Sequence, residues 1–183
     1  MSPRSSAGAS VTVNPEVDAP PAANLGWALG MVLRRWHERV EHALGDLPQG
    51  PRGFHVLSAV VHQDLPTQAA LASHLAIDRT VMTYLIDELE EAGLVERTPD
   101  PHDRRARRIV ATTRGRKVLV EAERQVAAVE EFVFRGLAPE DKATFLALTQ
   151  RTANLIREED PTTDPCVAVK EVLDLSEGPN SRR

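Results

Sequence analysis

The sequence predicts a mainly α-helical protein with one small β-hairpin. Apolar residues recur at three- and four-residue spacing along most of the chain, which is the period of an amphipathic helix. Two such segments, one short and one longer, are separated by a short turn, and the second ends at a glycine. Two short runs with β-branched residues then flank a turn that contains Pro and Asp, which is typical of a hairpin. The 183 residues suffice for one domain with its own core.

Composition and charge exclude several classes of protein. The net charge is −5, 42% of the residues are hydrophobic, and no apolar run approaches the ~20 residues of a membrane span. No hydrophobic signal core follows the early Arg4. The single cysteine, Cys166, excludes an intrachain disulfide framework. We therefore expect a cytoplasmic protein without membrane contact.

The N-terminal third begins with residues 1–23, which contain four prolines and which we expect to be disordered. Helical periodicity starts at Asn24 and continues to about Ala43, and Gly45 follows as a helix stop. A loop with two prolines is expected over residues 46–52. A second helix should then run from residue 53 to about residue 64.

The centre of the chain predicts a helix-turn-helix followed by a hairpin. Thr67 and Asp78 suit the N-cap positions of two helices, because their side-chain oxygens can accept hydrogen bonds from free backbone N–H groups. Gly93 before Leu94 predicts a Schellman ending for the second helix. Strands are expected over residues 95–98 and 107–111.

Two long helices are expected after the hairpin, over residues 113–135 and 139–159. The first of them has 23 residues and would be roughly 34 Å long. The predicted helix-turn-helix and hairpin are too small to cover a helix of this length. Its apolar face therefore needs another protein surface to pack against. Residues 161–183 should form a flexible tail, in which residues 167–175 could alternatively form a short helix.

Basic residues are concentrated around the predicted hairpin. Between Arg97 and Lys117 there are eight basic residues against two acidic ones. Because a polyanion docks by the local field rather than by net charge, this segment favours a nucleic-acid partner. The alternative is a solvated run of charges without a partner.

The second helix of a helix-turn-helix presents its N-terminal residues to base edges and phosphates in the major groove of DNA. Val81, Met82 and Leu85 are expected to face the core. The side chains left for the groove are Arg79, Thr80, Thr83 and Tyr84. Arginine can bind guanine through two hydrogen bonds, and threonine can contact a phosphate or a thymine methyl group. Taken alone, the helix also fits an ordinary solvated amphipathic helix.

The hairpin carries Arg104, Arg105 and Arg107, and a hairpin packed beside the second helix is a wing. An arginine at the tip of a wing can enter the minor groove, and Arg105 is the candidate. Phosphates would repel Asp103, so we expect this residue to brace the hairpin by pairing with an arginine.

Residues 103–115, DRRARRIVATTRG, resemble the wing signature of the MarR family of transcriptional regulators, in which an Asp-x-Arg pair precedes a strand, Leu-Thr and a glycine. The preceding EEAGLVER at residues 90–97 also resembles that family. Ala111 departs from the usual leucine, which would loosen packing under the wing. The resemblance covers residues 25–159 in helix order and is specific over residues 67–115.

The resemblance implies a winged helix-turn-helix homodimer that binds a pseudo-palindromic operator in double-stranded DNA, most often as a repressor. It divides residues 24–160 into a DNA-binding lobe over residues 53–111 and dimerisation helices over residues 24–45 and 113–160. Such regulators often bind a small aromatic or anionic effector between these parts. The first two helices offer Trp27, Trp36, His37 and His55 for such a pocket.

Other functions find less support in the sequence. No nucleophile with a convincing base, glycine-rich phosphate loop or metal-ligand motif indicates an enzyme, a cofactor or a metal site. Cys166 has no nearby arginine or histidine to activate its thiol for redox sensing. A winged-helix protein–protein adaptor without DNA binding remains the alternative function, because the fold alone does not imply DNA.

Overall fold

The computed structural model describes residues 25–63, 65, 67–100, 107–162, 164, 165, 167–169 and 171. The elements, in chain order, are α1 (Leu25–Ala43), α2 (Gly50–His62), α3 (Gln68–Leu75), α4 (Arg79–Glu91), β1 (Val95–Pro99), β2 (Arg107–Ala111), α5 (Thr113–Val133) and α6 (Pro139–Glu159). Predictions for residues 1–23 and for most of the C-terminal tail fall outside the described residues.

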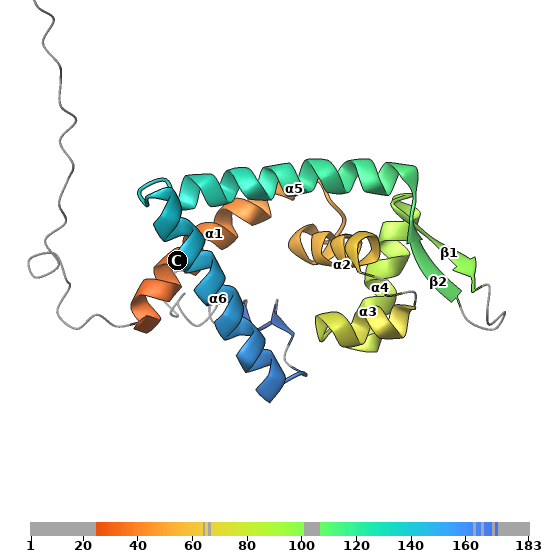
Figure 1. Cartoon of the computed structure of the whole chain (residues 1–183). Coiled ribbons are helices and arrows are strands. Elements are labelled where there is room, and N and C mark those ends of the chain that lie inside the picture. The colour runs from red at the N-terminus through yellow and green to blue at the C-terminus, as the bar shows by residue number, and fades with distance from the viewer. Residues whose placement is uncertain are drawn as a thin grey trace, which may run out of the picture.

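Helix α5 runs along one side of the molecule and joins its two ends (Figure 1). The hairpin and α2, α3 and α4 lie beneath its N-terminal end, whereas α1 crosses its C-terminal half and α6 turns back at an angle (Figure 1). Within the described residues, no helix combines the length and apolar character that a membrane crossing requires.

Two clusters of buried side chains hold the fold together. The larger cluster joins α2, α3, α4 and the hairpin to the start of α5, with Leu57, Leu71, Met82, Ile86 and Leu119 among its members. The smaller cluster contains Val40, Leu44, Ala122 and Val129, and lies between α1 and the rest of α5. Because α5 contributes to both clusters, it is the rigid connection between the two ends of the molecule.

The hairpin is antiparallel, with Val95 opposite Ala111, Arg97 opposite Ile109 and Pro99 opposite Arg107. A further bridge joins Thr67, just before α3, to Arg108. Val95 and Ile109 are buried in the larger cluster. The hairpin is therefore anchored to the helices at its base.

The helix ends confirm several sequence predictions. Gly93 has φ of 68°, Gly93 N donates to Glu90 O at 2.8 Å, and Leu94 N donates to Leu89 O at 2.9 Å. These two bonds are the Schellman pattern. Thr67 and Asp78 cap α3 and α4 as predicted, since both side chains accept hydrogen bonds from backbone N–H groups.

Two predicted boundaries are wrong. The loop expected over residues 46–52 ends at Gln49, because α2 begins at Gly50. Pro51 fits the first turn of a helix, where its missing N–H would have no partner. Helix α5 ends at Val133, two residues before the predicted end at Arg135.

Gly115 allows the start of α5 to lie against the segment that leaves α4. A Cβ atom at this position would lie 1.9 Å from Leu94 O, far inside contact distance. Thr112 fixes the same junction: its hydroxyl donates to Gly93 O at 2.7 Å and accepts from Gly115 N at 2.9 Å. The junction therefore has no space for a side chain at position 115.

We predict that Gly115→Ala destabilises the fold by about 1–3 kcal/mol, because the helix must move away from Leu94. Urea unfolding followed by circular dichroism measures the change. Gly136→Ala is the matched control, since nothing lies within 4 Å of a Cβ added there. Equal stability of the two variants would contradict the close contact at Gly115.

Candidate nucleic-acid interface

The turn between α3 and α4 fixes how α4 leaves the core. Ala76 ends α3 in the left-handed conformation, with φ of 53°. Ile77 is buried, and its N–H donates to Ala72 O at 2.9 Å. This anchor directs the N-terminus of α4 outward from the larger cluster, in the arrangement of a helix-turn-helix.

Asp78 holds the first turn of α4 together. Its carboxylate accepts hydrogen bonds from Thr80 N at 2.7 Å and from Val81 N at 3.3 Å. These backbone hydrogen bonds hold the pKa of Asp78 below its usual value. The capped turn presents the partial positive charge of the helix N-terminus to solvent.

The two faces of α4 separate as the sequence predicts. Met82 and Leu85 are buried and Val81 is half-buried against the same cluster. The four residues expected on the opposite face are all exposed: Arg79, Thr80, Thr83 and Tyr84. Tyr84 retains 66% of its accessible surface, an unusual amount for a large aromatic side chain.

Gln68, at the start of α3, also belongs to this surface and was not identified from the sequence. Its Nε2 donates to Thr83 Oγ1 at 2.7 Å, and Thr83 Oγ1 donates to Arg79 O at 2.9 Å. The Thr83 hydroxyl is therefore oriented by both helices. No local spacing indicates a contact between residues 15 apart on two different helices.

Three of the four acidic residues of α4 are engaged behind its exposed N-terminal turn. The Arg97 guanidinium forms ion pairs with both Asp87 and Glu90, and Gln49 Nε2 donates to Glu88 Oε2 at 2.8 Å. Burial opposes the charge of Arg97, but the hydrogen bonds to both carboxylates raise its pKa. Arg97, counted among the basic residues of the segment, is thus neutralised by α4.

The wing is described only at its base. Arg107 is exposed at the start of β2. Arg108, the next residue, has its Nε atom 4.0 Å from Asp100 Oδ2. The predicted tip residues Arg104 and Arg105 and the predicted brace Asp103 lie outside the described residues. Arg107 is therefore the one predicted wing contact that the structure places.

The four residues predicted for an effector pocket lie at different depths. Trp27 is 62% exposed near the start of α1, and Trp36 is half-buried against the smaller cluster. His37 Nε2 lies 3.7 Å from Glu41 on the same helix. The His55 ring packs edge-on to Phe54, and burial lowers the pKa of His55, although the charge of Asp164 opposes this shift.

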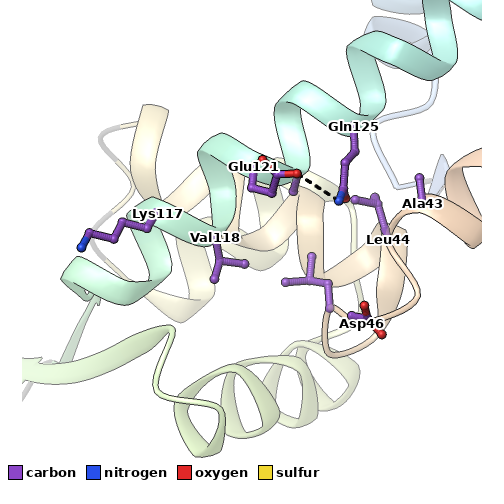
Figure 2. A pocket seen from close by; sticks show the side chains of 9 residues that line it. Ala43, Leu44, Asp46, Lys117, Val118, Glu121 and Gln125 are labelled. Carbon is purple, nitrogen blue, oxygen red and sulfur yellow. Dashed lines mark hydrogen bonds between the residues drawn. The ribbon is translucent and has the colours of Figure 1, made fainter.

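A shallow pocket of about 380 Å³ lies elsewhere, between the end of α1 and the first half of α5 (Figure 2). Apolar side chains form its floor, and Asp46, Lys117, Glu121 and Gln125 form its polar rim. The Gln125 amide donates to Glu121 at 3.3 Å across one turn of α5. None of the four residues predicted for an effector pocket lines it.

Comparisons with known proteins agree with this architecture. A model of the MarR family matches residues 51–106, which span α2, the helix-turn-helix and the first strand. CouR from Rhodococcus jostii, solved bound to p-coumaroyl-CoA, is 31% identical, with a TM-score of 0.54 over 76% of this chain and 91% of that one. This chain belongs to the MarR family.

Two further structures extend the comparison. The transcriptional repressor CouR bound to a 23-mer DNA duplex is 29% identical, with a TM-score of 0.63 over 71% of this chain and 92% of that one. A mutant of MarR from E. coli shares the fold at 24% identity, with a TM-score of 0.62 over 73% of this chain and 99% of that one. The protein is a winged helix-turn-helix transcriptional regulator of the MarR family.

We predict that Asp78→Ala lowers the melting temperature of this MarR-family protein, and that the difference from the wild type shrinks as pH falls. The folded-state pKa of Asp78 is lowered, so its contribution is present above the unfolded-state value of 3.8 and is lost as pH falls through the folded-state pKa. Thermal unfolding between pH 7 and pH 3 measures the difference. If the difference in melting temperature between the wild type and Asp78→Ala stayed constant over this pH range, the ionised Asp78 carboxylate would not be what stabilises the start of α4.

Proposed function

We propose that this regulator is a homodimer that represses transcription by binding a pseudo-palindromic operator, and that a small molecule releases it from DNA. The observation that supports this most directly is the N-terminal part of α4, where Arg79, Thr80, Thr83 and Tyr84 are exposed together over two turns. Asp87 and Glu90, further along the same helix, are paired with Arg97. A polyanion that approaches the N-terminus of α4 meets Asp78, whose carboxylate accepts hydrogen bonds from Thr80 N and Val81 N, but it does not meet Asp87 or Glu90 unpaired.

Each exposed side chain in this part of α4 has a definite role in the proposal. Arg79 reads guanine through its two-pronged guanidinium, and Thr80 contacts a phosphate. Thr83, held by Gln68, offers its methyl group to thymine. Tyr84 supplies an exposed ring and hydroxyl at the edge of the groove.

The wing contributes a second contact in this proposal. Arg107 at its base reaches the DNA backbone, and Arg104 and Arg105 extend towards the minor groove. Asp103 braces the hairpin by pairing with an arginine. The sequence resemblance over residues 103–115 supports these assignments.

The second copy of the chain is proposed to cover the apolar surface of α1 and α6. No residue of α6 is buried, although the helix carries large apolar side chains. The exposed apolar residues of these helices are Leu25, Trp27, Leu29, Met31, Leu146, Leu148, Leu155 and Ile156. An apolar surface of this extent on a monomer marks an interaction site, and a two-fold axis would set two α4 helices about one turn of DNA apart.

The effector is proposed to be a small aromatic or anionic molecule. CouR, which is 31% identical, was solved with p-coumaroyl-CoA, and a 29% identical CouR structure holds DNA. The residues proposed to receive the effector are Trp27, Trp36 and His37 on α1 and His55 on α2. The effector would act between the parts of the chain.

We also propose that residues 53–111 form a DNA-binding lobe and that residues 24–45 and 113–160 form the dimerisation helices. The proposed regulator acts in the cytoplasm and catalyses no reaction.

We predict that Arg79→Ala weakens binding to the preferred duplex about tenfold and relaxes sequence preference, because a bidentate contact to a base contributes about 1–3 kcal/mol. Fluorescence anisotropy with labelled duplexes selected from the source genome measures both quantities. Arg124→Ala is the control, since this exposed arginine on α5 is paired with Glu121. If both variants kept the wild-type preference, Arg79 would not read bases. If the wild type bound no duplex in a salt-dependent way, a protein–protein adaptor would be favoured instead.

We predict that Leu148→Asp converts the dimer to a monomer that is folded but binds the operator weakly. A charge at the centre of an apolar interface is left unpaired when two copies meet. Sedimentation velocity measures the assembly state. Gln150→Asp is the matched control, because a residue two positions along a helix points to the opposite side. If Leu148→Asp and the control sedimented alike, α6 would not form the interface.

A further inference from the structure

Three arginines converge on one aromatic ring at the end of α5 remote from the hairpin. Phe132 lies on the last turn of α5, where α1 crosses it (Figure 1). The guanidinium carbon of Arg39 lies 3.3 Å from the centroid of this ring, that of Arg135 lies 4.2 Å from it and that of Arg35 lies 5.8 Å from it. We call these four residues the Phe132 cluster.

The positive charge of the Phe132 cluster is poorly compensated by the rest of the described chain. Arg39 and Arg135 form no ion pair with any described residue, and Arg135 Nη1 donates only to Phe132 O, at 2.9 Å. Arg35 pairs with Glu38 at 3.6 Å, but this carboxylate is shared with Arg34, at 3.0 Å. This surplus of positive charge is found in a chain whose net charge is −5.

Arg39 contains an unsatisfied donor. Its Nε atom is buried and has no hydrogen-bond partner among the described residues. A buried donor without a partner costs free energy, and each close pair of like charges adds to this cost. An anion bound beside the guanidinium groups would offset the repulsion between them.

We propose that the Phe132 cluster binds a small oxyanion, either a phosphate group or a carboxylate group. Contact with the ring restrains the guanidinium groups, and the N–H groups that are neither buried nor used by Phe132 O and Glu38 remain to donate. Two or three such groups fit the oxygens of a phosphate or carboxylate through paired, charge-assisted hydrogen bonds. The site lies on α1 and the C-terminal turn of α5, away from α4 and the hairpin, so it does not depend on the proposed DNA contacts.

Thermal unfolding of the full-length chain tests this proposal. Inorganic phosphate, and separately acetate, replaces chloride at constant ionic strength, and the melting temperature is followed against anion concentration. A ligand that binds the folded state raises the melting temperature in a saturable way. We expect saturable stabilisation by at least one anion, and the anion that acts at the lower concentration identifies the favoured group.

Variants locate the site. Arg39→Gln and Arg135→Gln should raise the half-saturating concentration at least tenfold, while Arg124→Gln, which removes an exposed and paired arginine of α5, should leave it unchanged. Because Arg135 is exposed, its variant serves as the test if Arg39→Gln does not fold.

Three results would overturn the proposal. They are no saturable effect on the wild type, equal responses of Arg39→Gln and Arg124→Gln, and dissociation of a wild-type dimer by Arg39→Gln in sedimentation velocity. The last result would assign the cluster to contacts with a second copy. DNA affinity of Arg39→Gln, measured in chloride, separates this proposal from the proposed function, since it should match the wild type.

Discussion

The contact between the start of α5 and the segment leaving α4 is the constraint on which the rest of the structure depends. Leu94 O accepts from Thr112 N at 3.0 Å, and Gly115 lies against the same residue without a side chain. This junction fixes the end of α4, the base of the hairpin and the direction of α5 together. Because all three elements leave one point, the geometry between the exposed turn of α4 and the wing cannot change without disturbing α5.

That constraint gives α5 a mechanical role. Leu119 belongs to the cluster that supports α4, while Ala122 and Val129 belong to the cluster that contains α1. A single helix thus has side chains in both buried clusters, three residues apart at the closest point. Since packed helices respond to changes as rigid bodies, a ligand that alters the α1 side of α5 would reorient the surface around Arg79. In the proposed function, release from DNA by an effector would therefore need no direct contact between the effector and α4.

The sequence predicted features that depend on residues close together in the chain. The caps at Thr67 and Asp78 and the Schellman ending at Gly93 were predictable, because each involves hydrogen bonds within a few residues. The exposed and buried faces of α4 followed from its periodicity. Contacts between distant residues were not predictable: Gln68 with Thr83, and Arg97 with Asp87, join separate elements. The start of α2 was missed because Pro51 was interpreted as part of a loop, although proline also suits the first turn of a helix.

The arginines show that the number of charges in a segment predicts its attraction for anions less well than their positions and partners in the fold do. Arg97, in the basic segment, pairs with Asp87 and Glu90 and contributes little field to solvent. Arg79, outside that segment, is exposed at a helix N-terminus, where the backbone adds positive potential. Arg39 lies in a part of the chain that shows no unusual charge in sequence, yet the fold brings it beside Arg135, nearly a hundred positions away, on a single ring. Local charge is therefore set by pairing in three dimensions, and a net charge of −5 is compatible with separate surfaces that attract anions.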